Sequence, residues 1–300
     1  MSPPAAAIAL PLVLGLALWA TPPPRALPGA TNQTALPRFC DAAPETLPAL
    51  VREVAVLAGV RSRVLSASER FLGVPYQFDP LGEGPGQPPD EDPRLRYDLA
   101  DCQTFIETVL ALARARSPQE VLPILDEVRY DGPVGYSRRN HFFEAQWVPS
   151  NSRKGYVREV TAQIAGKDAV RHVKAITHRQ WKERTLGERI DLPEERAPIG
   201  DHALAYLPLA KVLAHAKAIP SGTLFAVVRA DRPQLPTMVS HVGIVVQQPG
   251  GTFVRHAGRD LYSQVIDEQM AHFVERNALY TKWPVLGLQL LEVLERPASE

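Results

Sequence analysis

Apolar residues in the first third of the chain recur at the spacing of an α-helix. Leu50, Val54 and Leu57 begin a run of this kind, which predicts one amphipathic helix over residues 45–72. The same spacing after a Ser-Pro pair predicts another helix over residues 119–128. Between them, residues 77–96 are rich in Gly, Pro and Asp and show no period, so we expect a long, functional loop.

A further helix is expected to open at Asp101. Phe105, Val109 and Leu112 line one face of it, and a Ser-Pro pair ends it near Arg116. Asp is a preferred residue at a helix start, because its carboxylate accepts hydrogen bonds from backbone N–H groups that the helix leaves unpaired. Asp101 is therefore predicted to cap this helix.

The second half of the chain changes to short, β-branched segments separated by turn residues. They predict strands over residues 223–229, 241–247, 252–256, 262–266 and 287–294. A Pro-Gly-Gly turn predicts that the second and third of these strands pair as a hairpin. We also expect a short strand at 160–165 and charged helices at 168–184 and 203–218. Helices followed by an antiparallel meander predict an α+β fold.

A continuous apolar run at residues 5–20 precedes all of these elements. It is short for a bilayer span, which needs about 20 residues, and it predicts a secretory signal peptide; an uncleaved N-terminal anchor is the alternative. Residues 21–43 are rich in Pro and Ala and predict a tether, which leaves residues 44–296 as a single domain. We therefore expect an exported protein of the periplasm or cell envelope, without stable membrane insertion if the signal is cleaved.

Charge and cysteine content narrow the classes of partner. The 33 basic and 33 acidic side chains give a formal net charge of zero, which argues against nucleic acid as a partner. Two cysteines are too few for a disulfide framework, although a single Cys40–Cys102 bridge is an alternative in an exported protein. The sequence leaves the oligomeric state open.

Cys102 is the strongest candidate for chemistry, because it directly follows the predicted helix cap. The start of a helix carries partial positive charge and unpaired N–H groups, which favour a thiolate with a lowered pKa. A thiolate attacks amide carbonyls, and the same N–H groups can then bind the oxyanion that forms. The alternative is a buried structural cysteine.

A nucleophile of this kind needs a base, and His241 opens the first strand of the predicted hairpin. If the two strands pair, His256 on the second strand lies beside His241 and can orient its ring, as the third member of a catalytic triad does. Either histidine alone is more often a satisfied polar residue at a strand end. The combination with Cys102 is what favours catalysis.

Metal and cofactor chemistry have no support in the sequence. The chain contains no H-E-x-x-H or C-x-x-C motif, no Gly-rich phosphate loop and no G-x-S-x-G elbow. We therefore predict neither a metal site nor a cofactor.

The order of the motifs resembles a known family. The chain contains, in sequence, F-L-G-V-P-Y (71–76), D-C-Q-T-F-I-E-T (101–108), S-G-T-L-F-A-V (221–227), H-V-G-I-V-V (241–246) and R-H-A-G (255–258). This order is similar to that of the NlpC/P60 superfamily of papain-like cell-wall cysteine hydrolases. The D-C-x-T-F-x-E-T form resembles its DUF1460 branch, the N-acetylmuramoyl-L-alanine amidase-like proteins, and the resemblance covers about residues 45–296.

The resemblance implies a papain-like α+β core, in which the nucleophile helix packs on an antiparallel sheet, with extra helical insertions. It implies that Cys102 is the nucleophile, His241 the base and His256 the orienting residue. It places Tyr76 and His141 at the substrate cleft, and we expect Asp101, next to Cys102, to bind substrate with them.

The implied substrate is peptidoglycan or a muropeptide. The reaction that the resemblance favours is hydrolysis of the amide between N-acetylmuramic acid and L-alanine. Cleavage within the stem peptide, between D-glutamate and diaminopimelate, is the alternative within the same chemistry. An alternative of another class is a cell-wall binding protein without catalytic activity.

Overall fold

The computed structural model describes residues 37–185 and 190–295. The apolar run at 5–20 and most of the expected tether lie outside these residues. Within the described part, none of the helices combines the length and the apolarity that crossing a bilayer requires.

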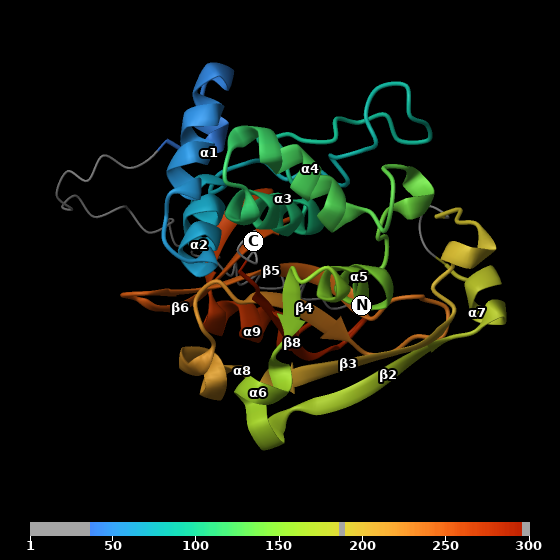
Figure 1. Cartoon of the computed structure of the whole chain (residues 1–300). Helices are drawn as coiled ribbons and strands as arrows, with labels where there is room; N and C mark the ends of the chain where they lie inside the picture. The colour runs from blue at the N-terminus through green and yellow to red at the C-terminus, as the bar shows by residue number, and fades with distance from the viewer. Residues whose placement is uncertain (1–36, 186–189, 296–300) are drawn as a thin grey trace, which may run out of the picture. The chain divides into compact units, whose positions relative to one another are not determined.

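Four helices from the first half of the chain cover one face of a sheet (Figure 1). They are α1 (Leu47–Ala55), α2 (Val60–Arg70), α3 (Cys102–Arg114) and α4 (Pro118–Arg129). α3 and α4 confirm two of the predicted helices. The single helix predicted over residues 45–72 is wrong, because Gly59 between α1 and α2 has a φ of 76°, in the left-handed region that a continuous α-helix excludes.

The sheet is antiparallel and has the strand order β2-β3-β8-β4-β5-β6-β7, with β1 also paired to β8. Its strands are β1 (Val157–Glu159), β2 (Val170–Ile176), β3 (Gly200–Pro208), β4 (Leu224–Arg229), β5 (Val239–Gln248), β6 (Gly251–Gly258), β7 (Gln264–Gln269) and β8 (Val285–Val293). β4 to β8 confirm the five strands predicted in the second half, although β7 begins and ends later than expected. The β5–β6 hairpin and the α+β class are confirmed as well.

The two charged stretches that were predicted to be helical also contain strands: β2 takes up much of residues 168–184, and β3 takes up the first part of residues 203–218. β2 and β3 pair along their whole length, from Val170 opposite Tyr206 to Ile176 opposite Gly200. Most of β2 is exposed or half-exposed, so its sequence lacks the apolar alternation by which a strand is recognised. In the first stretch, α-helix is confined to α7 (His178–Lys182), whereas α8 (Leu209–His215) and the 3-10 turn Ala216–Ala218 confirm the predicted helix over most of the second.

Residues 160–165 were predicted to be a strand, and this prediction is also wrong. They contain the whole of the short helix α6 (Thr161–Ala165), and the strand β1 ends just before it. The remaining helices are α5 (Val148–Arg153) and α9 (Met270–Ala278).

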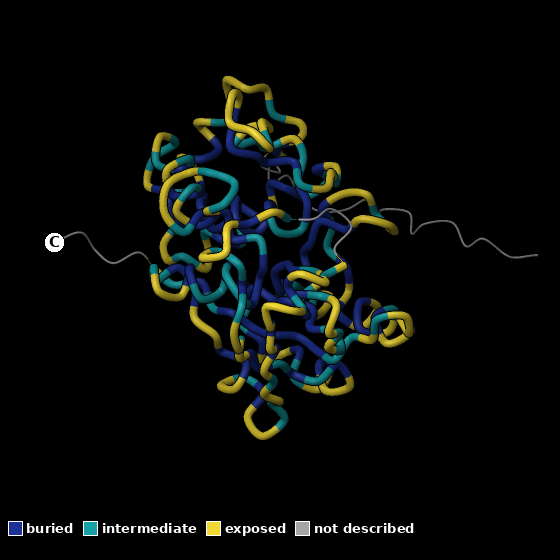
Figure 2. The backbone as a smooth tube through the Cα atoms, turned by 90° about the vertical axis from the view of Figure 1, so that its right-hand side faces the viewer, coloured by how far each residue is buried: buried dark blue, intermediate teal, exposed yellow. Residues whose placement is uncertain are grey.

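The inner strands are buried on both faces, as the dark core in Figure 2 shows. In β4, Leu224 and Ala226 pack with the core of α1 to α4, whereas Phe225 and Val227 pack with α8 and α9 on the opposite face. This two-faced burial matters for the site, because side chains on alternate residues of β5 and β6 then belong to different layers.

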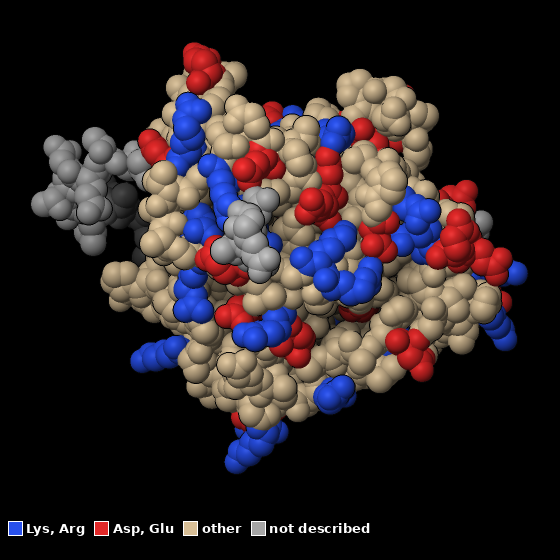
Figure 3. All heavy atoms as spheres, viewed as in Figure 1, with Lys and Arg blue, Asp and Glu red and all other residues tan. Residues whose placement is uncertain are grey.

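The loop at residues 77–96 is held by ion pairs rather than by regular structure. The guanidinium of Arg139 reaches the carboxylates of Asp79, Glu83 and Asp90 at 3.2, 2.7 and 2.6 Å. Basic and acidic side chains are mixed over the face seen in Figure 3, in keeping with the zero net charge.

Candidate active site

Cys102 is the first residue of α3, and a reciprocal cap fixes this end of the helix. The backbone N–H of Thr104 donates to Asp101 Oδ1 at 2.7 Å, and the backbone N–H of Asp101 donates to Thr104 Oγ1 at 3.0 Å. Asp101 Oδ2 also accepts from the backbone N–H of Asp79 at 3.1 Å. The prediction that Asp101 caps this helix is confirmed, and the carboxylate ties the helix start to the loop.

The thiol of Cys102 meets the sheet where β5 and β6 separate. The pairing of these strands runs from Gln248 and Gly251 to Ile244 and Arg255, and it stops there. The backbone N–H of Val242, two residues from Ile244 and outside this pairing, lies close enough to the sulfur to oppose the rise of the thiol pKa. The helix start therefore meets the sheet beyond the paired part of the hairpin, and Cys102 lines the same cleft as His241.

His241 and His256 form a hydrogen-bonded pair, as their places on the hairpin predicted. His241 Nε2 lies 2.9 Å from His256 Nδ1, and the two rings are perpendicular. Both rings are on the face of the sheet that carries α9, since His241 lies near Phe225 and His256 near Phe273. α3 packs on the other face, and the thiol and both rings line one cleft beyond Ile244 and Arg255, the last paired residues of β5 and β6.

His256 also contacts a buried carboxylate, that of Glu268, which the sequence analysis did not predict as part of the site. His256 Nε2 lies 3.0 Å from Glu268 Oε2, and Glu268 on β7 is only 3% exposed. Arg276 on α9 donates to both oxygens of Glu268 at 2.7 Å, and His272 Nδ1 lies 2.7 Å from one of them. No local motif marks Glu268, because its role depends on the pairing of β6 with β7, in which His256 lies opposite Ile266.

One cleft of about 480 Å³ brings the candidate residues together. Its lining includes, from the predicted set, Tyr76, Asp101, Cys102, His241 and His256. His141 is not among them. It lines an adjoining hollow of about 180 Å³ that shares Phe78 and Asp101 with the cleft, and its Nε2 lies 2.8 Å from the carbonyl oxygen of Tyr136.

The charge state of the site differs from the one predicted. Burial, followed by the charge of Asp101, raises the pKa of the Cys102 thiol to about 12, against hydrogen bonds from the backbone N–H groups of Val242, Cys102 and Gln103. Burial, followed by His256, lowers the pKa of His241 well below 6.5. The predicted lowering of the thiol pKa by the helix start is therefore wrong for the resting site, because desolvation outweighs the helix dipole. The resting pair is a thiol and a neutral imidazole.

Cys102 is not consumed by a disulfide. Cys40 and Cys102 are both free thiols, Cys40 exposed and Cys102 half-buried, so the bridged alternative does not hold. Among the residues that the structure describes, no cluster of three or more His, Cys, Asp or Glu side chains is arranged to hold a metal ion.

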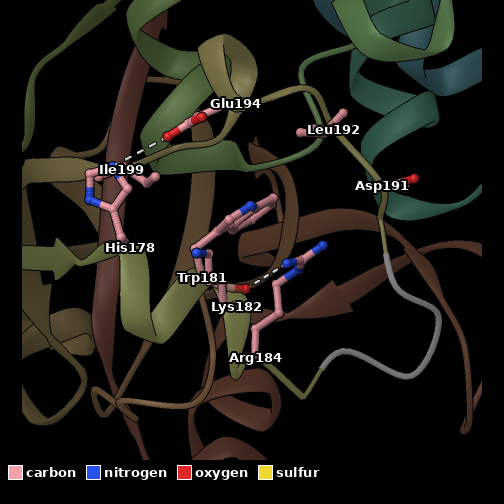
Figure 4. A pocket seen from close by; sticks show the side chains of 8 residues that line it. All are labelled: His178, Trp181, Lys182, Arg184, Asp191, Leu192, Glu194 and Ile199. Atoms are coloured by element: carbon pink, nitrogen blue, oxygen red, sulfur yellow. Dashed lines mark hydrogen bonds and ion pairs between the residues drawn. The ribbon is translucent and has the colours of Figure 1, made fainter.

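A second hollow, of about 560 Å³, lies beside α7 and shares no lining residue with the Cys102 cleft (Figure 4). Trp181 forms one wall, and Arg184 donates to the Trp181 carbonyl oxygen at 2.5 Å. His178 faces Glu194 across it, with 3.8 Å between His178 Nε2 and a carboxylate oxygen. These contacts stabilise the segment around α7, and no cysteine is among the described residues that line the hollow.

Comparison with solved structures supports the fold. A DUF1460 protein of Legionella pneumophila is 25% identical, with a TM-score of 0.70, over 83% of this chain and 95% of that one. An N-acetylmuramoyl-L-alanine amidase of Bacteroides uniformis is 22% identical, with a TM-score of 0.62, over 77% and 99% of the two chains. A putative xylanase of Bacteroides fragilis is 23% identical, with a TM-score of 0.61, over 76% and 100%.

No curated protein matches the chain. The model of the AmiA-like family, described as N-acetylmuramoyl-L-alanine amidase-like, matches residues 66–281. That range contains Cys102, His241, His256 and Glu268, and it runs from the end of α2 to just beyond α9. The chain therefore belongs to the AmiA-like (DUF1460) family of N-acetylmuramoyl-L-alanine amidase-like proteins.

Proposed function

We propose that this protein is a cysteine-dependent peptidoglycan hydrolase that cuts the amide between N-acetylmuramic acid and L-alanine. One observation carries the proposal: Cys102 and the hydrogen-bonded pair of His241 and His256 line the same cleft. The family match and the name of the Bacteroides uniformis relative support the choice of bond.

The contacts of Glu268 determine which nitrogens of the two rings carry protons. Burial alone raises the pKa of Glu268, but hydrogen bonds from His256 and Arg276 outweigh it and lower the pKa to about 2, so the group is a carboxylate. A carboxylate only accepts, so His256 Nε2 carries a proton. Burial, opposed by Glu268, lowers the pKa of His256, so the ring is neutral and its Nδ1 must accept from His241 Nε2. His241 Nδ1 is then left with a free lone pair.

This lone pair makes His241 a base. In the proposed reaction, the Cys102 sulfur attacks the amide carbonyl carbon while His241 Nδ1 takes the thiol proton. His256 and Glu268 stabilise the imidazolium that forms, as the acidic member of a triad does. Backbone N–H groups at the start of α3 bind the oxyanion. His241 then returns the proton to the leaving amine, and water hydrolyses the thioester.

A neutral resting pair suits this sequence of steps. Because the thiol pKa is raised and the imidazole pKa is lowered by burial, proton transfer accompanies attack instead of preceding it. The nucleophile helix packed on an antiparallel sheet supports a papain-like core, and Tyr76 and Asp101 at the cleft are proposed to contact the substrate.

Two further features are proposed, one from the sequence and one from the sequence together with the position of His141. The apolar run at residues 5–20 supports export to the periplasm or cell envelope, where peptidoglycan lies. His141 is proposed to contact a more distant part of the substrate, from the hollow that adjoins the cleft.

The test is product analysis on defined muropeptides. Wild-type protein and the Cys102→Ala variant are incubated with muropeptides, and the products are identified by mass spectrometry. Release of a stem peptide that begins with L-alanine, absent in the variant, supports the proposal. Cleavage after D-glutamate indicates the endopeptidase instead. Binding without products, equal in both proteins, indicates a wall-binding protein and overturns the hydrolase.

A further inference from the structure

Arg229 is held rigidly in the wall of the Cys102 cleft. It is the last residue of β4 and lines the same cleft as Cys102 and His241. Its Nε donates to Ser240 Oγ at 2.6 Å, and its Nη1 donates to the Trp283 carbonyl oxygen at 2.6 Å. Its guanidinium carbon also lies 4.6 Å from the ring centre of Tyr280. Two hydrogen bonds and a ring contact therefore fix this guanidinium in one orientation.

Arg229 differs from the other arginines of the cleft in having no acidic partner. Arg276 is paired with Glu268 at 2.7 Å, and Arg259 lies 3.5 Å from the carboxylate of Asp260. Within residues 37–185 and 190–295, no carboxylate forms an ion pair with Arg229, and both of its hydrogen bonds go to uncharged oxygens. Burial lowers the pKa of Arg229, as expected for a half-buried cation without a counter-ion.

An arginine has five N–H donors, and the described contacts of Arg229 use two of them. The Nη2 group has no acceptor among the described residues, and the planar guanidinium matches a carboxylate in a two-point contact. Exposed Tyr280 and half-buried Trp283 bound the same wall, and both line the cleft. A fixed cation without a partner, beside the proposed nucleophile, is suited to an anionic group of the substrate.

We propose that Arg229, framed by Tyr280 and Trp283, is a subsite that binds a carboxylate of the substrate. The inference rests on the proposed function, because the muropeptide is what supplies the carboxylate. Two sources carry the required chemistry on the stem peptide: the α-carboxylate of D-glutamate, which follows L-alanine, and the carboxylate at the end of the stem. Arg229 is thus a specificity residue that selects a charged stem over an amidated one.

The experiment compares three substrates. They are N-acetylmuramoyl-L-Ala-γ-D-Glu-L-Ala, the same compound with the D-glutamate α-carboxylate changed to a carboxamide, and the same compound with the terminal carboxylate changed to a carboxamide. We expect the wild type to lose about 10-fold to 100-fold in kcat/KM on one of the two amides, and that amide identifies the carboxylate.

The variants separate recognition from structure. Arg229→Met is expected to lower kcat/KM on the parent compound to the level of the sensitive amide, with little change on that amide. Arg229→Lys is expected to restore part of the preference. Arg259→Met, which removes a cation of the same cleft that already has a partner, is the matched control and keeps the preference. The subsite would be overturned if Arg229→Met lowered kcat/KM equally on all three substrates, or if this variant kept the wild-type preference for the parent compound over the sensitive amide.

Binding to Cys102→Ala protein distinguishes this inference from the proposed function. Calorimetric titration of the three compounds into Cys102→Ala, with and without Arg229→Met, measures recognition without cleavage. Preference for the charged compound that depends on Arg229 supports the subsite, even if the wild type cleaves nothing and the hydrolase proposal fails. Cleavage and binding without any such preference overturn the subsite alone, and absence of both binding and cleavage for all three compounds overturns both proposals.

Discussion

His241 Nε2 lies 2.9 Å from His256 Nδ1, and this contact couples the tautomers of the two rings. Only one of the two nitrogens can carry the shared proton, so whatever fixes His256 also fixes His241. Glu268, 3.0 Å from His256 Nε2, is that determinant. The property that makes His241 a base is thus set by a carboxylate two side chains away.

Substitution of Glu268 tests this coupling. In Glu268→Gln, the amide can donate to His256 Nε2 and favour the reverse tautomers, which leaves a proton on His241 Nδ1. We expect kcat to fall by about 10²-fold to 10⁴-fold with little change in KM. Ring nitrogen NMR shifts are expected to show the exchanged tautomers. His272→Ala is the matched control, since half-exposed His272 contacts the same carboxylate but lies outside the path to His241; an equal loss in both variants contradicts the role of Glu268.

The pH dependence of activity reports the burial of His241. A histidine with the ordinary pKa of 6.5 becomes protonated, and stops acting as a base, as the pH falls through 6.5. Because burial lowers the pKa of His241 well below that value, the basic form persists in mild acid. We expect kcat/KM on an uncharged amide substrate to stay constant from pH 7.5 to 5.5. An acidic limb centred near pH 6.5 would show that His241 is solvated in the working enzyme.

The ionisation of Cys102 is measured by the pH dependence of alkylation. Since burial raises the pKa of this thiol to about 12, its thiolate fraction continues to grow with pH above neutrality. In a Cys40→Ala background, the rate of reaction with iodoacetamide is expected to rise about tenfold per pH unit up to pH 10. A plateau reached by pH 8 would instead indicate a thiolate already present in the resting site.

The cap of α3 is expected to contribute to stability as well as to position. Asp101→Ala removes the acceptor of the Thr104 N–H and is expected to lower the free energy of unfolding by about 1–2 kcal/mol. Urea denaturation measures the change. Ser117→Ala at the start of α4 is the matched control, because the Ser117 side chain makes no capping hydrogen bond there. If the free energy of unfolding falls equally in the two variants, the capping hydrogen bond of Asp101 does not contribute to stability.

Gly243 lies two residues after His241 on β5, and an added side chain has no room there. A Cβ atom at this position would lie 2.7 Å from the Arg255 carbonyl oxygen and 2.7 Å from the Phe225 ring. Gly243→Ala is therefore expected to lower the free energy of unfolding by about 1–3 kcal/mol. In Gly250→Ala, in the hairpin turn, the added Cβ would lie 3.6 Å from its nearest neighbour, so the free energy of unfolding is expected to fall much less. Thermal melts of both variants provide the comparison. Equal melting temperatures would mean that small backbone shifts accommodate the added Cβ at Gly243.

The sequence by itself determined the local features of this protein. The cap at Asp101, the helix that follows it and the β5–β6 hairpin are set by residues close together in the chain, so periodicity and turn chemistry predict them. The proximity of His241 and His256 followed from the same hairpin. The order of motifs was sufficient to indicate the family.

The tertiary structure alone decided what depends on distant partners. β2 and β3 pair in spite of a polar pattern, because strand pairing satisfies their backbone whichever side chains they carry. Glu268 reaches His256 through the pairing of β7 with β6. Cys102 lines one cleft with both histidines beyond the end of the β5–β6 pairing, although α3 packs on the other face of the sheet. Burial, which the sequence does not specify residue by residue, reversed the expected direction of the Cys102 pKa.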